Sequence, residues 1–284
     1  MMLPGHPSQT LLGSAIRRAQ HQLLDAPVIL HDPVVVDLVP EASEPGILPE
    51  YGSSNERVPT LFRAMFAMRS RFAEDRLAEA AARGVRQYVM IGAGLDTFPW
   101  RQPDFARDLH IFAADHPASL SWTHRRLREH RVAKPSNLTH VPVDLEEKRL
   151  GEQLTACGFD LETPSFCSVL GVTQYLERDA VGALLRFALS LRSGSEIVFS
   201  FVPPDDELGS DDLDIVVRCV ARTTKLGEPW KCRLRPRDLI ADLGHVGFSD
   251  LFHFTPEIAQ ARYFADRQDG LRAPKWEHLI AAIV

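Results

Sequence analysis

Residues 87–97 read Gln-Tyr-Val-Met-Ile-Gly-Ala-Gly-Leu-Asp-Thr, a short apolar run followed by a glycine-rich turn. The apolar part, residues 87–91, has the length and composition of a buried strand. Gly92 and Gly94 allow the backbone to turn sharply and to approach a ligand closely. Because the turn directly follows a strand, we expect a ligand-binding site there; the alternative is a tight turn without a ligand.

The chain around this run alternates short apolar strands with helices. An amphipathic helix over residues 60–83 precedes it, and a helix with i, i+3, i+4 spacing of apolar residues lies between the fourth and fifth strands. Such alternation indicates a parallel sheet covered on both faces. We therefore expect an α/β, Rossmann-like, seven-stranded, mostly parallel sheet. The strands after the first are predicted at residues 109–114, 138–143, 165–170, 196–202, 248–254 and 277–284.

We predict that the 284 residues form a single domain. Residues 1–59, which are rich in proline, are expected to form an N-terminal helical cap. The cofactor-binding core follows over residues 60–202. Residues 203–235 break the strand–helix rhythm and are predicted to be an inserted helical lid, and residues 236–284 return to the core.

The composition argues against several classes of protein. A net charge of −6 is unusual for a nucleic-acid binder. The four cysteines form no C-x-x-C pair, so neither a zinc site nor any other metal site is predicted. No apolar run reaches the length of a membrane span, and the first 25 residues lack a signal-peptide core. We expect a cytoplasmic protein that contacts neither nucleic acid nor membrane.

The turn itself favours one cofactor over another. Thr97 stands where a dinucleotide-binding fingerprint has its third glycine, which favours S-adenosylmethionine over NAD. Asp115, at the end of the second strand, can accept hydrogen bonds from ribose hydroxyls of either cofactor, or it belongs to a helix cap before Pro117. Asp144, after the third strand, can accept from an adenine amino group, with Leu145 on the ring face; alternatively it caps the next helix.

Arg69 lies on the apolar face of the predicted helix over residues 60–83, whereas Arg71 lies on the opposite face. A charge on an apolar face is costly unless it is paired. We therefore expect an anionic partner for Arg69, either a structural acid or the carboxylate of a ligand.

The loop after the fourth strand should lie where a transferable group would point. Gln174 and Tyr175 can offer hydrogen bonds to a substrate there, although Tyr175 can also be a half-buried packing residue. His116 is the one histidine that we consider as a general base. In the predicted lid, Arg218 and Arg222 are one turn apart and either bind an acidic substrate or face solvent.

Together these residues resemble the leucine carboxyl methyltransferase family, in its bacterial branch of class I S-adenosylmethionine-dependent methyltransferases. The resemblance covers residues 17–202 and extends more loosely to the end. Its most specific match is the turn over residues 92–97, in which Asp96-Thr97 after the glycines is typical of the family. Residues 19–33, a partly helical entry that ends in His31-Asp32-Pro33, match as well. It implies that Arg69 holds the cofactor carboxylate, Asp115 the ribose, and Asp144 with Leu145 the adenine. The cofactor-binding set that we predict is Arg69, Gly92, Ala93, Gly94, Asp96, Thr97, Asp115, His116, Asp144, Leu145 and Gly171.

One position departs from the family. The family often carries a glutamate before the glycine of the tyrosine loop, where it helps to hold the cofactor amino group, and this chain has Leu170. The ammonium must then find other acceptors, for which we consider the backbone carbonyls of Gly92 and Gly171. Arg18 is a second candidate for the cofactor carboxylate.

The expected activity is methyl transfer from S-adenosylmethionine to a carboxylate of a small molecule, with Gln174 and Tyr175 positioning the substrate. A carboxylate is ionised at neutral pH and needs no base, whereas a phenol would benefit from one. A phenol or hydroxyl methyltransferase, an NAD(P)-dependent oxidoreductase and a non-catalytic cofactor-binding protein are the alternatives. A protein C-terminus is a second class of acceptor.

Overall fold

The computed structural model describes residues 9–44, 57–147 and 149–284. Of the predicted N-terminal cap, residues 1–8 and 45–56 lie outside the described residues.

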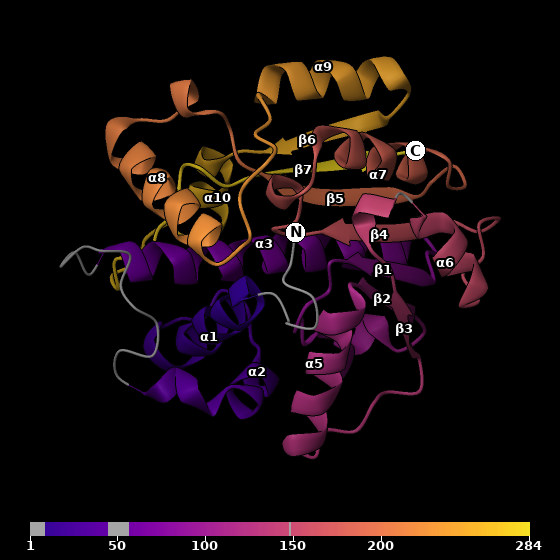
Figure 1. The fold of residues 1–284 in the computed structure, drawn as a ribbon, viewed down its shortest axis with the longest axis horizontal. Coiled ribbons are helices and arrows are strands. Elements are labelled where there is room, and N and C mark those ends of the chain that lie inside the picture. The colour runs from indigo at the N-terminus through magenta and orange to yellow at the C-terminus, as the bar shows by residue number, and fades with distance from the viewer. Residues whose placement is uncertain (1–8, 45–56, 148) are drawn as a thin grey trace.

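A seven-stranded sheet forms the centre of the molecule, as predicted (Figure 1). The strand order is β3-β2-β1-β4-β5-β7-β6, in which β1 to β5 run parallel and β7 is antiparallel to both β5 and β6. The order reverses between β1 and β4, which is where an open α/β sheet binds its ligand. The strands are β1 Gln87–Ile91, β2 His110–Asp115, β3 Leu138–Pro142, β4 Ser165–Val169, β5 Glu196–Phe201, β6 Ser249–Phe254 and β7 His278–Ile283.

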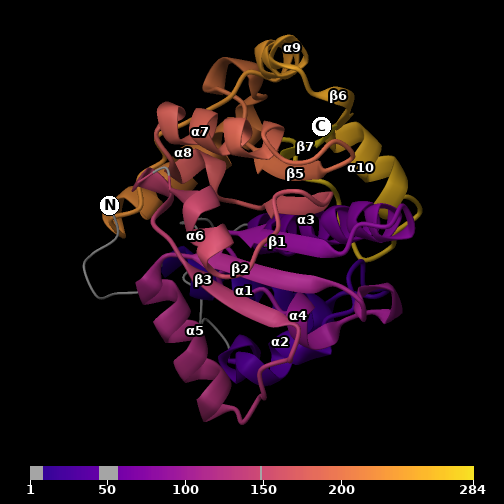
Figure 2. The same cartoon turned by 90° about the vertical axis from the view of Figure 1, so that its right-hand side faces the viewer.

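Helices cover both faces of this sheet (Figure 2). Since strand side chains alternate, Tyr88 and Met90 of β1 pack in the cluster that contains α3 and α10. Val89 and Ile91 pack in the opposite cluster, with α6, α7 and α9. The helices are α1 Gln9–Leu24, α2 Pro33–Leu38, α3 Arg57–Ala82, α4 Phe98–Arg101, α5 Pro117–Glu129, α6 Leu150–Ala156, α7 Arg178–Leu189, α8 Ser210–Lys225, α9 Pro236–Val246 and α10 Pro256–Tyr263.

Helix α10 lies between the last two strands, where the strand predictions left an unassigned stretch. It begins at a sequence signal, because Thr255 caps its first turn by accepting from Ile258 N and Pro256 occupies the first helical position. In the described part of the chain, no helix is both long and apolar enough to cross a membrane.

The N-terminal helices pack against the glycine-rich turn. Leu11 and Ile16 of α1 and Leu38 of α2 form one apolar cluster with Leu95 of the turn and Leu127 of α5. Through this cluster, α1 lies over the turn after β1.

Helix α8 occupies the middle of the segment predicted as a lid. Its Ile215, Val216 and Cys219 pack in one apolar cluster with Phe62 at the start of α3 and with Trp276 before β7. The segment therefore extends one wall of the fold beyond the carboxyl ends of the strands (Figure 1).

Candidate functional site

A cavity of about 860 Å³ opens at the carboxyl edge of the sheet. Its floor consists of the turns after β1, β2, β3 and β4, and its walls come from α1, α3, α8 and the segment before β7. Small-molecule sites commonly measure about 300–1,000 Å³, so this cavity can hold a ligand pair.

The turn after β1 has a backbone that requires glycine. Gly92 has φ +73° and Gly94 φ +56°. A Cβ on Gly92 would lie 2.3 Å from Cγ2 of Val172. The amide of Gly92 donates to the carbonyl of Ala114 at 2.8 Å, which ties the turn to β2. Gly92, Ala93, Gly94 and Asp96 all line the cavity.

Asp115 at the end of β2 braces the same turn. Its Oδ2 accepts from Gly94 N and its Oδ1 from His116 N, both at 2.6 Å. Burial raises the pKa of Asp115 above its usual range, and the two amides oppose that shift. The carboxylate lines the cavity, so the structure gives it both a structural contact and an exposed edge toward a ligand.

Asp144 and Leu145 follow β3 and line the cavity. The Oδ1 of Asp144 accepts from Glu146 N at 3.0 Å, the capping contact that was the alternative to adenine binding. Both functions are compatible, because a carboxylate has two oxygens and each can accept more than one hydrogen bond. The adenine contact stays a prediction.

Arg69 pairs with an acid of the chain inside the cavity. Its Nη1 donates to Oε1 of Glu277 at 3.2 Å, and the two residues are 9% and 3% exposed. The guanidinium also lies over the ring of Phe66, 4.6 Å from its centroid. A Cβ on Gly171, whose φ is +70°, would lie 2.5 Å from Nη1 of Arg69, so another residue there would be strained and would displace the guanidinium. Of the two predicted partners, the structure shows the acid and leaves the ligand carboxylate as a prediction.

Thr97 differs from the other predicted site residues. It is fully buried and is not among the residues that line the cavity. Its hydroxyl donates to Oδ2 of Asp32 at 2.6 Å, and Arg18 donates to the carbonyl of Leu95. The Asp-Thr pattern therefore anchors the turn to the segment before α2, which corrects our expectation of a direct contact from Thr97. Arg18, in contrast, lines the cavity.

The loop after β4 forms the side of the cavity that faces α8. Gln174 and Tyr175 lie in a short 3₁₀ turn and line the cavity. The side-chain oxygen of Gln174 is buried with no hydrogen-bond partner among the described residues. Tyr175 packs edge-on against Trp230, with ring centroids 6.4 Å apart. Burial raises the pKa of Tyr175 well above its usual range, so its hydroxyl stays protonated.

His116 caps helix α5. Its Nδ1 accepts from Ala118 N at 3.2 Å, and the ring lines the cavity. An accepting Nδ1 places the proton of the neutral ring on Nε2, which makes that nitrogen a donor.

The sequence interpretation missed several lining residues. The cavity is also bordered by Glu277, Arg17, Glu228 and Trp230. Glu277 carried one usable signal, since it is the single acidic residue between Trp276 and the end of the chain. Arg222 lines the cavity, whereas Arg218 pairs with Asp214 at 2.6 Å on the outer surface of α8. Arg218 thus lies on the outer side of the helix, and the binding of an acidic substrate by Arg222 stays a prediction.

The proteins that are similar to this chain in sequence are methyltransferases by name. A family model described as leucine carboxyl methyltransferase matches residues 11–189. YktD of Bacillus subtilis (strain 168), named as an S-adenosyl-L-methionine-dependent methyltransferase, is 28% identical over 303 aligned residues that cover 99% of each chain. A protein of Mycobacterium avium (strain 104) with the same type of name is 33% identical over 178 residues, which cover 59% of this chain and 56% of its own.

Two solved structures share the fold at low sequence identity. A methyltransferase structure from Thermobifida fusca superposes with a TM-score of 0.58 at 15% identity and covers 99% of this chain and 96% of its own. A DUF574 family protein from Streptomyces avermitilis superposes with a TM-score of 0.57 at 16% identity, covering 94% and 96%. At these identities the likeness concerns the fold alone.

Proposed function

Because this chain belongs to the leucine carboxyl methyltransferase family and is an S-adenosylmethionine-dependent methyltransferase, we propose that it methylates a carboxylate oxygen of a small-molecule acceptor. The observation that carries the proposal is the composition of the cavity end beneath α8. There, Arg17 and Arg222 accompany aromatic side chains, so an acidic and largely apolar molecule fits.

The residues at the opposite end of the cavity fit the cofactor. Gly92 and Gly171 border the cavity without a side chain of their own, and Val172 and Arg69 pack beside them. Arg69 would meet the carboxylate of the methionine part, Asp115 the ribose, and Asp144 with Leu145 the adenine. When bound, S-adenosylmethionine supplies a methyl group on a sulfonium, which is already a good leaving group. The protein therefore needs mainly to position the acceptor and exclude water.

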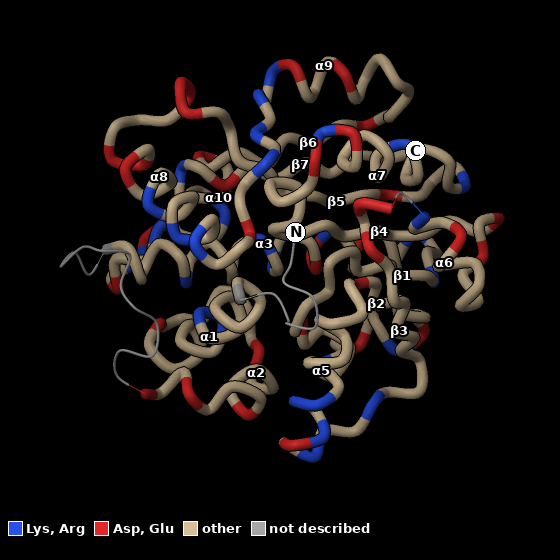
Figure 3. Tube along the Cα trace, in the orientation of Figure 1, with Lys and Arg blue, Asp and Glu red and all other residues tan. Residues whose placement is uncertain are grey.

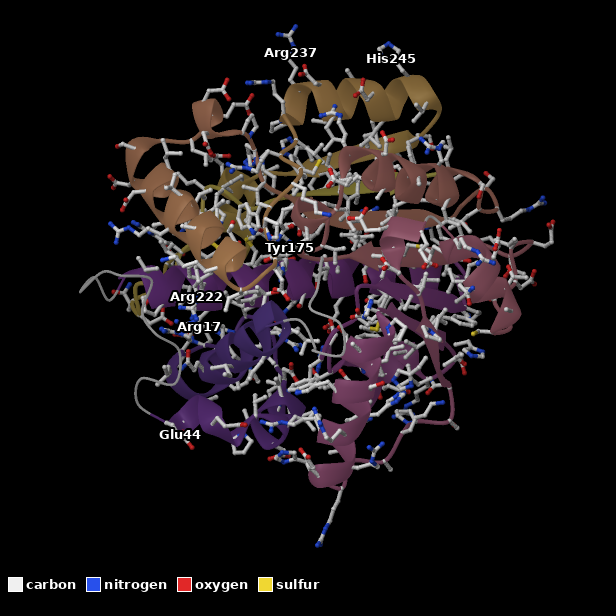
Figure 4. All side chains as sticks on the ribbon, in the orientation of Figure 1. Arg17, Glu44, Tyr175, Arg222, Arg237 and His245 are labelled. Carbon is white, nitrogen blue, oxygen red and sulfur yellow. The ribbon has the colours of Figure 1, made fainter. Side chains whose placement is uncertain are left out.

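The acceptor end lies between α1 and α8. Arg17 and Arg222 point into the same gap between these helices, with Tyr175 nearby (Figure 4). Helix α8 is acidic in its first turn and basic in its last, and the basic turns face α1 (Figure 3). This arrangement of charge attracts an anion to the inner end of α8.

A carboxylate suits the proton chemistry of the cavity. It is ionised at neutral pH and needs no base. A phenol would require one, but the Nδ1 of His116 is occupied by a backbone amide and the raised pKa of Tyr175 keeps its proton in place. Glu228, a third titratable group, already accepts from Thr10 N at 3.2 Å.

Contacts around the cavity mouth favour a small acceptor over a protein C-terminus. Glu228 joins the segment after α8 to the start of α1. Lys231 pairs with Glu146 at 2.9 Å, and its backbone amide donates to the carbonyl of Gln174 at 2.7 Å. These contacts tie the segment after α8 to α1 and to the loops after β3 and β4 at the edge of the cavity, which favours a small acceptor over an entering polypeptide.

The chemistry of the product tests the proposal. The enzyme is incubated with S-adenosylmethionine carrying a labelled methyl group and a panel of aromatic and aliphatic carboxylic acids and phenols. Methyl esters release volatile labelled methanol in alkali, whereas aryl methyl ethers do not. We expect base-labile label with acids. Label that appears only in base-stable products of phenols would contradict a carboxylate acceptor.

Arg69 and its neighbour Arg71 test the orientation of the cofactor. Arg69→Ala should weaken binding of S-adenosylhomocysteine by on the order of 100-fold, because a buried charge partner is lost. Arg71→Ala should leave binding unchanged, since Arg71 is half exposed and pairs with Asp75. Calorimetry measures both, and equal effects would remove the carboxylate role of Arg69.

A further inference from the structure

We infer that Glu277 binds the ammonium group of the cofactor's methionine part and so replaces the acid that this chain lacks at Leu170. The inference rests on the cofactor orientation of the proposed function, in which Arg69 takes the carboxylate. It concerns the cofactor end of the cavity and is independent of the acceptor.

Leu170 cannot take the part of its family counterpart. It is apolar, half-buried and packed against the large cluster beneath α3. Because an ammonium inside a protein needs acceptors, either backbone carbonyls such as those of Gly92 and Gly171 or an acid from another element must accept from it.

Glu277 reaches the same corner of the cavity from the opposite end of the chain. It directly precedes β7, whose first residue, His278, pairs with Phe201 at the carboxyl end of β5. Ser200 of β5 lies at this corner, where its Oγ accepts a hydrogen bond from Gly171 N at 2.8 Å. The carboxylate of Glu277 therefore lies beside the glycine that follows Leu170.

Arg69 connects the two sites. Its guanidinium contacts Glu277 at 3.2 Å and leaves room for no side chain at Gly171. Both charges are buried and both line the cavity. A buried carboxylate is costly unless it is paired, and Arg69 provides one such partner.

The charge pattern matches a zwitterion. If a carboxylate alone approached Arg69, it would lie close to Glu277 and the two anions would repel each other. An α-amino acid brings an ammonium with its carboxylate, so Arg69 and Glu277 can each meet the opposite charge. Burial raises the pKa of Glu277, and a bound ammonium would favour the ionised form, as Arg69 does.

Ligand analogues separate this role from a structural one. Calorimetry would compare S-adenosylhomocysteine with its deaminated counterpart, in which hydrogen replaces the amino group. The natural chain should bind S-adenosylhomocysteine at least tenfold more tightly. Glu277→Gln should lose that preference: S-adenosylhomocysteine should bind at least tenfold more weakly, whereas the deaminated compound should bind as tightly or more tightly, because the repulsion from the Glu277 carboxylate is removed.

Other outcomes overturn the inference. Equal weakening of both compounds would mean that Glu277 only holds Arg69 in place. Tighter binding of S-adenosylhomocysteine by Glu277→Gln would mean that Glu277 competes with the ligand carboxylate. If Glu277→Gln does not fold, Glu277→Asp retains the charge and should keep a preference for the amino group, and equal weakening of both compounds in that variant would also contradict the inference.

Glu196→Gln is the matched control. Glu196 is a buried acid at the other end of β5, paired with Arg76 at 2.6 Å and with Arg83 at 2.5 Å, and it does not line the cavity. Glu196→Gln should lower the stability of the protein without changing the preference for the amino group of the ligand. If the acceptor is not a carboxylate, the methylated products will be stable in base, but the affinities for the two cofactor analogues will not change. The two proposals can therefore be rejected independently of each other.

Discussion

The two ends of the cavity are built by different means. At the cofactor end, turns that directly follow parallel strands bring Gly92, Asp115, Asp144 and Gly171 together, and the register of the sheet fixes their spacing. At the acceptor end, side chains such as Arg17 and Arg222 come from separate helices that meet only through packing. The first end depends on backbone geometry, and the second depends on side chains that can change without disturbing the sheet.

The largest expected effect is that of a substitution in the glycine-rich turn at the cofactor end of the cavity. Gly92→Ala places a methyl group 2.3 Å from Cγ2 of Val172 at a φ of +73°. The turn must shift, so we expect the loss of S-adenosylhomocysteine binding by more than 100-fold and a destabilisation of about 2–4 kcal/mol. Calorimetry and thermal unfolding measure the two effects.

Gly84→Ala is the control for backbone strain. Gly84 also has a positive φ, +100°, but nothing lies within 4 Å of an added Cβ. It should lose about 1–3 kcal/mol of stability and retain cofactor affinity. If Gly84→Ala weakened the cofactor as Gly92→Ala does, general strain would explain both, and the close contact at Gly92 would carry no special role.

A smaller effect separates the acceptor end from the cofactor end. Arg222→Ala should raise the KM of a carboxylic acid acceptor on the order of tenfold, because one cation near the anion is removed. Affinity for S-adenosylhomocysteine should not change. Arg218→Ala, on the outer side of the same helix, should change neither quantity. A loss of affinity for S-adenosylhomocysteine in Arg222→Ala would contradict the assignment of Arg222 to the acceptor end alone.

The smallest effect concerns Tyr175, at the junction of the two ends. Tyr175→Phe should lower kcat by a factor of about 3–10, the value of one hydrogen bond. Because burial raises the pKa of this phenol, its hydroxyl stays protonated and should cause no loss of kcat/KM up to about pH 10. With a carboxylate already ionised, kcat/KM should be flat from about pH 6 to 9. A tenfold rise per pH unit would indicate that the acceptor itself must lose a proton.

Much of the cofactor end was predictable from local patterns. Apolar strands of five or six residues, the glycines at 92 and 94, and the acids at strand ends are features of adjacent residues, and they predicted the seven-stranded sheet that the structure shows. The helical periodicity that placed Arg69 on an apolar face also predicted a buried partner. Thr97 shows the limit of local patterns: its motif was recognised, but its partner, Asp32, is 65 residues away in the sequence.

The sequence by itself determined the fold class, the family and the position of the cofactor turn, because strand alternation, helical periodicity and glycine turns depend on neighbouring residues. Only the tertiary structure decided that Glu277 meets Arg69 across 208 residues, that Arg222 faces the cavity while Arg218 faces solvent, and that Thr97 lies behind the turn. Such contacts follow from how the antiparallel return of β7 and the packing of α8 close the fold, and no local pattern encodes the partner of a side chain so distant along the chain.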